Sequence, residues 1–151
     1  MFLWRTTDPV SSARMYKDKE HGFTNRSRPT KIFNTVYPVV KGDRVGLMCT
    51  DGESLLSAPI KFNKYRPVTL RDILKSIEAG MKVPFNPNTC DVESVYTIIA
   101  SFFSNKERLK LVTLFEQGRL TPYDLARDNY DYFQGGGLWK NGNMWVYAAG
   151  S

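Results

Sequence analysis

Basic and aromatic residues are interleaved in the segment from Arg14 to Lys31. Basic side chains neutralise phosphate groups and aromatic rings stack on bases, so this composition is typical of a nucleic-acid contact. Residues 1–31 hold seven basic and three acidic residues, a net charge of +4 out of +6 for the whole chain. The segment therefore predicts an anionic partner, with a solvated surface arm as the alternative. The nucleic-acid-binding candidates are Arg14, Lys17, Lys19, Arg26, Arg28 and Lys31.

A second group of residues is aromatic and lies near the C-terminal end. Residues 130–147 hold six aromatic side chains beside the triple glycine Gly135-Gly136-Gly137. Two roles fit this group: the rings close the core of the domain, or they bind a protein partner, because Trp and Tyr dominate interface hot spots. The partner-binding candidates are Phe133, Trp139, Trp145 and Tyr147.

Residues that could carry out catalysis are sparse. His21 is the single histidine, and it lies in the segment with the least regular pattern, so a Ser-His-Asp or Cys-His arrangement is not expected. Asp124, Asp128 and Asp131 recur at helical spacing and could hold a divalent cation, as in a small metal-dependent nuclease. A solvated helix face is the simpler interpretation. We therefore expect no enzymatic activity, no metal site and no cofactor.

Size and composition limit the class of protein. The chain has 151 residues, of which 42% are hydrophobic, which suits one soluble domain with a modest core. No stretch approaches the roughly 18 apolar residues of a membrane span, and Arg5 and Pro9 interrupt any secretory signal. We therefore expect neither a membrane partner nor secretion. The spacing of Cys49 and Cys90 favours reduced thiols and leaves a disulfide open.

The elements that must position these residues change in character along the chain. Residues 1–31 show no sustained period and predict an extended arm. Three strand-like runs follow and predict a small antiparallel meander. They cover residues 32–40, 44–49 and 54–60.

The second half of the chain carries clear helix signals. Thr69 and Asp72 form a short capping box before an amphipathic helix over 70–80. Further helix starts are Asp91, the Ser104-Asn105-Lys106-Glu107 capping box and Thr121-Pro122. Asn141-Gly142 predicts a terminal hairpin. The fold class is therefore α+β, with an extended basic arm, three to four short helices and a C-terminal aromatic hairpin.

These elements divide the chain into three parts. We predict an extended basic arm over 1–31, a single α+β domain over 32–133 and a glycine-hinged aromatic tail over 134–151. The triple glycine is interpreted as a hinge because it lacks the Lys-Ser/Thr that phosphate-binding loops use.

Part of the helical half resembles a known family. The stretches are Asp72-Ile73-Leu74-Lys75 leading to Gly80, a helix over 91–103, Glu107-Arg108-Leu109 to Phe115, and Leu125. Their order resembles the internal scaffolding protein of gokushovirus-type small single-stranded DNA phages. The resemblance implies an assembly factor without catalysis that works in the virion or the host cytoplasm. It also implies that the aromatic residues bind the inner surface of a coat protein.

Three functional hypotheses follow. The first is a viral structural or assembly protein that binds a coat or other structural protein through the aromatic tail, and nucleic acid or a partner through the basic arm. Such a protein is expected to self-associate. The second is a free-standing nucleic-acid-binding module, whose binding falls steeply with salt. The third is the small metal-dependent nuclease.

Overall fold

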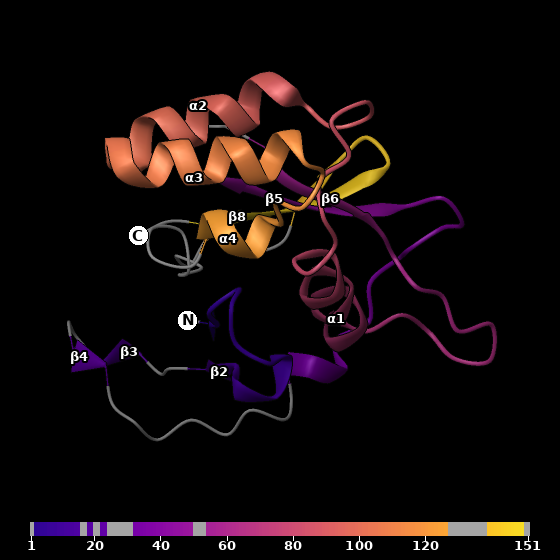
Figure 1. Ribbon diagram of the computed structural model, residues 1–151. Helices are drawn as coiled ribbons and strands as arrows, with labels where there is room; N and C mark the ends of the chain where they lie inside the picture. Colours follow the sequence, from indigo (N-terminus) through magenta and orange to yellow (C-terminus); the bar gives the residue numbers. More distant parts are fainter. Residues whose placement is uncertain are drawn as a thin grey trace.

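The computed structural model describes residues 2–15, 18–19, 22–23, 32–49, 54–126 and 139–149. The α+β class predicted from the sequence is confirmed, because these residues form four α-helices and a four-stranded sheet (Figure 1). The strands of that sheet are β5 (Arg44–Cys49), β6 (Ser54–Pro59), β7 (Trp139–Asn141) and β8 (Met144–Ala149). The helices are α1 (Leu70–Gly80), α2 (Val92–Phe102), α3 (Asn105–Glu116) and α4 (Pro122–Ala126).

The sheet has the strand order β6-β5-β8-β7 and is mixed. Strands β5 and β6 pair in antiparallel, as the predicted meander requires, whereas β8 pairs with β5 in parallel and with β7 in antiparallel. The register sets Val45 beside Trp145 and Leu47 beside Tyr147. Because side chains alternate along a strand, these four residues share one face of the sheet, and all four are buried.

The predicted antiparallel meander is therefore wrong in one respect. Residues 32–40 form no strand of the sheet: Ile32–Asn34 make a 3₁₀ turn, η2, and Val36 makes an isolated bridge with Thr69. Pro38 has no N–H to donate, and the Val39 N–H donates to the Tyr37 carbonyl. The place beside β5 is taken by β8 instead.

The start of the chain packs on α1. Strand β1 (Phe2–Leu3) pairs with β2 (Arg14–Met15), with the 3₁₀ turn η1 (Val10–Ser12) between them, and β3 (Asp18–Lys19) pairs with β4 (Gly22–Phe23). Trp4, Val10 and Ala13 are buried in the same core as the sheet and helices. The Val10 N–H donates to Glu78 Oε2 of α1 at 2.6 Å.

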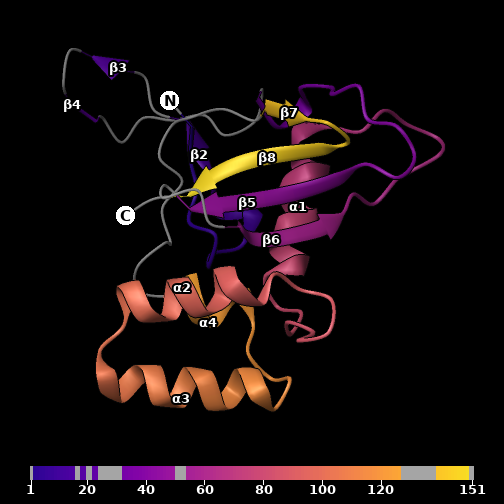
Figure 2. The ribbon, with the colours of Figure 1, turned by 90° about the horizontal axis from the view of Figure 1, so that it is seen from above.

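The helices begin where the sequence predicts. The Asp72 carboxylate accepts from the Thr69 N–H, Asp91 caps α2, and Glu107 accepts from the Ser104 N–H. Helix α1 lies against one face of the sheet, while α2, α3 and α4 gather beside β6 (Figures 1 and 2). In the described part of the chain, no helix has the length and apolarity needed to cross a bilayer.

Candidate nucleic-acid interface

The basic residues predicted to bind nucleic acid lie mostly beyond the structural description. Lys17, Arg26, Arg28 and Lys31 fall outside the described residues, and Arg14 and Lys19 are described only as backbone positions on β2 and β3. Strands β2 and β3 lie on the side of the molecule that carries the N-terminus (Figures 1 and 2). Binding by these six residues stays a prediction.

The structure separates the four predicted partner-binding residues. Phe133 lies outside the described residues, and Trp139 is 40% exposed on the outer strand β7. Trp145 and Tyr147 are buried, because β8 is an interior strand and these two positions face the core. The Tyr37 ring meets Trp145 edge-on at a centroid distance of 5.2 Å. Burial, and then the nearby Tyr37, raise the pKa of Tyr147.

Asp124, the first residue of the acidic row considered as a metal site, has a structural role. Asp124 Oδ2 accepts from both the N–H and the hydroxyl of Thr121 at 2.9 Å, which fixes the start of α4. Asp128 and Asp131 lie outside the described residues. Among the residues that are described, no three His, Cys, Asp or Glu side chains gather in a metal-binding group.

A different basic and aromatic segment is fully on the surface. Residues 61–67, between β6 and α1, are all exposed. They run Lys61-Phe62-Asn63-Lys64-Tyr65-Arg66-Pro67, and Tyr65 is 83% exposed while Phe62 is 44% exposed. The Lys64 ammonium lies 4.9 Å from the centroid of the Tyr65 ring. A large apolar ring held in water beside a cation is available for stacking.

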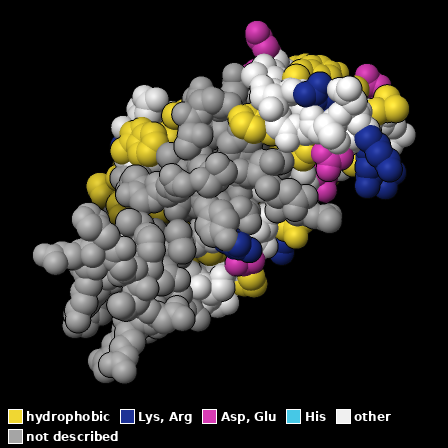
Figure 3. Space-filling view, turned by 90° about the vertical axis from the view of Figure 1, so that its left-hand side faces the viewer, with side chains coloured by type: hydrophobic (Ala, Val, Ile, Leu, Met, Phe, Trp, Pro, Cys, Tyr) yellow, Lys and Arg dark blue, Asp and Glu magenta, His cyan; other side chains and the backbone are white. Residues whose placement is uncertain are grey.

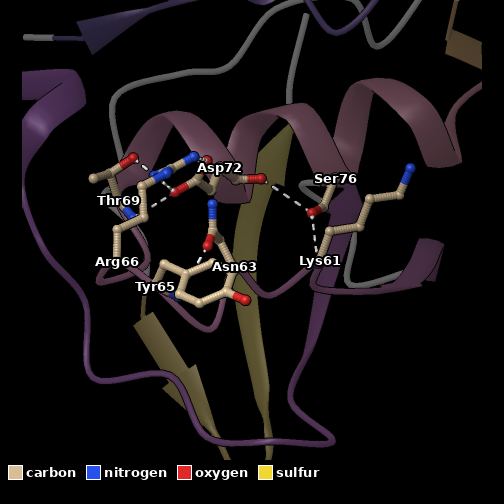
Figure 4. Close-up of polar contacts among 7 residues, drawn as sticks. All are labelled: Lys61, Asn63, Tyr65, Arg66, Thr69, Asp72 and Ser76. Atoms are coloured by element: carbon tan, nitrogen blue, oxygen red, sulfur yellow. Dashed lines mark hydrogen bonds and ion pairs between the residues drawn. The ribbon is translucent and has the colours of Figure 1, made fainter.

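Short-range hydrogen bonds give this loop its shape. Asn63 Oδ1 accepts from the Tyr65 N–H at 2.9 Å, and the Asn63 carbonyl accepts from the Arg66 N–H at 3.4 Å. The Lys61 N–H donates to Ser76 Oγ of α1 at 3.4 Å, which ties the start of the loop to the helix (Figure 4). Asn side chains favour such local turns, so the loop presents Tyr65 in a defined position.

Asp72 fastens the other end of the loop. Its two oxygens accept from the two terminal nitrogens of Arg66, each at 2.7 Å, and Oδ2 also accepts from the Thr69 N–H at 2.9 Å (Figure 4). One carboxylate thus caps α1 and clamps the loop. The Arg66 hydrogen bond is the main cause that lowers the pKa of Asp72, and the same bond raises the pKa of Arg66.

The charge around the loop is strongly positive. Residues 61–75 hold five basic residues and one acidic residue, a net charge of +4. The loop projects from the side of the molecule opposite the face in Figure 3. The basic residues are Lys61, Lys64, Arg66, Arg71 and Lys75.

Sequence reasoning missed this site, although the signal was present. The stretch from Lys61 to Arg66 shows the same alternation of basic and aromatic residues that drew attention to the segment from Arg14 to Lys31. In the sequence it follows the predicted strand over 54–60 as a polar stretch that ends the strand. Its attachment to Asp72 and Ser76 of α1 is not reported by the hydrophobic pattern.

No protein-family model, curated protein or solved structure matches the chain. The resemblance to phage scaffolding proteins stays a prediction. The function is therefore inferred from the geometry of the chain itself.

Proposed function

We propose that the protein binds single-stranded nucleic acid through loop 61–66 and the adjoining start of α1. The observation that carries this proposal is the Tyr65 ring, which is 83% exposed on a hydrogen-bonded loop among basic side chains. Single-strand sites combine a positive track for the backbone with aromatic rings on which bases stack. Loop 61–66 supplies both features within six residues.

The fixed shape of the loop favours binding. Ordering a flexible loop on association costs conformational entropy, and a loop already held by Asp72 and Ser76 avoids much of that cost. Arg66 is engaged by Asp72, so the phosphate contacts are assigned to Lys61, Lys64 and Lys75, which have no carboxylate partner among the described residues. Phe62 and Tyr65 are assigned to the bases.

The test measures the affinity for a fluorescent oligothymidylate of about 16 nucleotides by anisotropy. Tyr65→Ala is expected to weaken binding about tenfold or more, because loss of one base–aromatic stack costs about 1–3 kcal/mol. Tyr65→Phe keeps the ring and is expected to bind like the parent protein.

The matched control removes another exposed ring. Trp139→Ala deletes an aromatic ring on β7 that is 40% exposed, against 83% for Tyr65, and is expected to leave the affinity unchanged. Binding by Tyr65→Ala that equals the parent protein contradicts the proposal. So does an equal loss in Trp139→Ala, since that result reports general damage.

A second function is favoured by Trp139 itself. Strand β7 is one of the two edge strands of the described sheet, and a large apolar ring on such an edge suits a protein contact, as in the assembly role that the phage resemblance implies. We expect the protein to self-associate in light scattering as its concentration rises, and Trp139→Ala to remain monomeric. A parent protein that stays monomeric contradicts this second function.

A further inference from the structure

A cavity of about 700 Å³ lies beside β6, close to loop 61–66. Small-ligand sites in proteins measure about 300–1,000 Å³ and have mainly apolar walls with few polar groups. This cavity fits that description, since its apolar walls come from the sheet, α1, α2 and the segment between the two helices. Those wall residues include Leu56, Ala58, Ala79, Val83, Phe85 and Val95.

The cavity lining carries two cations, Arg44 and Lys61, and one carboxylate, Asp91. Arg44 Nε donates to Ser57 Oγ at 2.9 Å and Nη2 donates to the Ser57 carbonyl at 2.8 Å, so the guanidinium is held in place on the cavity wall. An arginine carries five N–H donors in a planar fork that matches phosphate geometry. Lys61 adds a second cation to the same lining.

The segment between α1 and α2 adds polar groups to the lining. Asn86 lines the cavity, and because its Oδ1 accepts from the Asn88 N–H at 2.9 Å, its amide nitrogen is the donor that it can offer to a ligand. Thr89 brings a hydroxyl to the same lining. Such donors match the carbonyl and ring-nitrogen acceptors of bases. Phe85 is steadied by an edge-on contact with Phe115 at 6.4 Å and offers a flat apolar wall.

Lys61 belongs to both the loop and the cavity. Its side chain extends along α1, away from Tyr65 and Arg66 (Figure 4), and it lines the cavity. Four residue steps separate Lys61 from Tyr65, so their Cα atoms lie at most about 14 Å apart. At about 3.4 Å per stacked nucleotide, this upper limit corresponds to about four nucleotides. A strand stacked on Tyr65 therefore comes beside the Lys61 backbone within about four nucleotides, and from there the Lys61 side chain extends to the cavity.

We propose that one base of the bound single strand leaves the stack and enters this cavity, with its phosphate on Arg44 and Lys61. This inference rests on the proposed function, because the same strand must lie on loop 61–66. It adds a specific binding site for one unstacked base to the stacking and phosphate contacts of the loop.

The experiment uses photocrosslinking on the full chain. An oligothymidylate that carries iododeoxyuridine is bound, irradiated and digested, and mass spectrometry locates the crosslinked residues. We expect two groups of crosslinks, one at Phe62 or Tyr65 and one within residues 83–90.

The variant that fills the cavity is Ala79→Trp, since Ala79 is exposed on α1 and lines the cavity. It is expected to lose the crosslinks in 83–90, keep those of the loop and bind about tenfold more weakly.

Two further variants serve as a control and as a replacement for Ala79→Trp. Ala100→Trp adds the same ring at an exposed position of α2 outside the cavity lining, and it is expected to crosslink like the parent protein. If Ala79→Trp does not fold, Arg44→Gln replaces it, and loss of the 83–90 crosslinks with loop crosslinks retained is expected again.

The outcomes separate the two proposals. Crosslinks confined to Phe62 and Tyr65 in the parent protein overturn the cavity inference and leave the proposed function standing. Crosslinks in 83–90 that survive Ala79→Trp, or that survive Arg44→Gln where it replaces Ala79→Trp, also overturn the inference. An absence of any binding to the oligonucleotide overturns the inference and the proposed function together.

Discussion

The described structure holds a lysine ammonium close to an aromatic ring at two places, and their surroundings are opposite. Lys64 lies 4.9 Å from the centroid of the Tyr65 ring, and Lys140 lies 5.2 Å from that of Trp145. Tyr65 is exposed to solvent, whereas Trp145 lies on strand β8 and its side chain is buried in the core. Among the residues that the structure describes, only the lysine of the second pair forms an ion pair with a carboxylate. Asp43 Oδ2 accepts from Lys140 Nζ at 2.8 Å, and the Asp43 side chain is 1% exposed.

That carboxylate decides what each pair can do. The Lys140 charge is already neutralised by Asp43, so this pair joins β7 and β8 to the residue that precedes β5. The Lys140 hydrogen bond is the main cause that lowers the pKa of Asp43, and it outweighs the effect of burial. Lys64 has no such partner among the described residues, so its charge is available to a ligand.

The largest expected effect is on stability at the buried pair. Lys140→Met leaves the Asp43 charge buried without its partner, which is expected to lower the free energy of unfolding by about 3 kcal/mol. Lys64→Met is the matched control and is expected to change it by less than about 0.5 kcal/mol, as is usual at the surface. Urea denaturation measures both values. An equal loss of unfolding free energy in the two variants would contradict the proposed difference between the two pairs.

The pH dependence of stability is a second test of the same buried pair. The pKa of Asp43 is lower in the folded protein, so its contribution to stability is present above the unfolded pKa, about 4, and is lost as the pH falls through the folded pKa. The difference in unfolding free energy between the parent protein and Lys140→Met is therefore expected to shrink below about pH 4. Urea denaturation at several pH values measures it. A difference that stays constant or widens in acid contradicts the assignment.

Much of the helical half could be predicted because its determinants are local. The capping residues Thr69, Asp91 and Ser104 act within one turn of the helices that they begin, so spacing alone reveals them. The sheet needed more than local pattern. Strand β8 pairs with β5 across about a hundred residues of intervening chain, and no hydrophobic period reports such a pairing.

The candidate site shows the same limit. Trp145 lies between Met144 and Val146 in the sequence and is in the core, whereas Tyr65 lies between Lys64 and Arg66 and is in solvent. For Trp145 the deciding contact is β8 with β5, and for Tyr65 it is the loop with Asp72 and Ser76. Residue type indicated the chemistry in both cases, while tertiary contacts fixed which ring can meet a partner.

An intermediate effect is expected where Asp72 joins the exposed loop to α1. Asp72→Ala removes the helix cap and the clamp on Arg66 together, and is expected to cost about 1 kcal/mol of stability. Hydrogen exchange is expected to rise both in residues 61–67 and in the first turn of α1. Arg66→Gln is the control, because it releases the loop and keeps the cap, so only the loop amides are expected to exchange faster. Equal exchange at the helix start in both variants would show that Asp72 does not couple the loop to the first turn of α1.

The smallest effect concerns the charge of the exposed pair. If Lys64 contacts a phosphate of a single strand, Lys64→Gln is expected to reduce the slope of log affinity against log salt concentration by about 0.7, one released counterion. Lys110→Gln removes an exposed lysine from α3 and is expected to leave the slope unchanged. Anisotropy titrations over a range of salt concentrations measure both slopes. Because the slope counts phosphate contacts and is insensitive to stacking, an unchanged slope in Lys64→Gln would assign Lys64 to positioning the Tyr65 ring and leave the phosphates to Lys61 and Lys75.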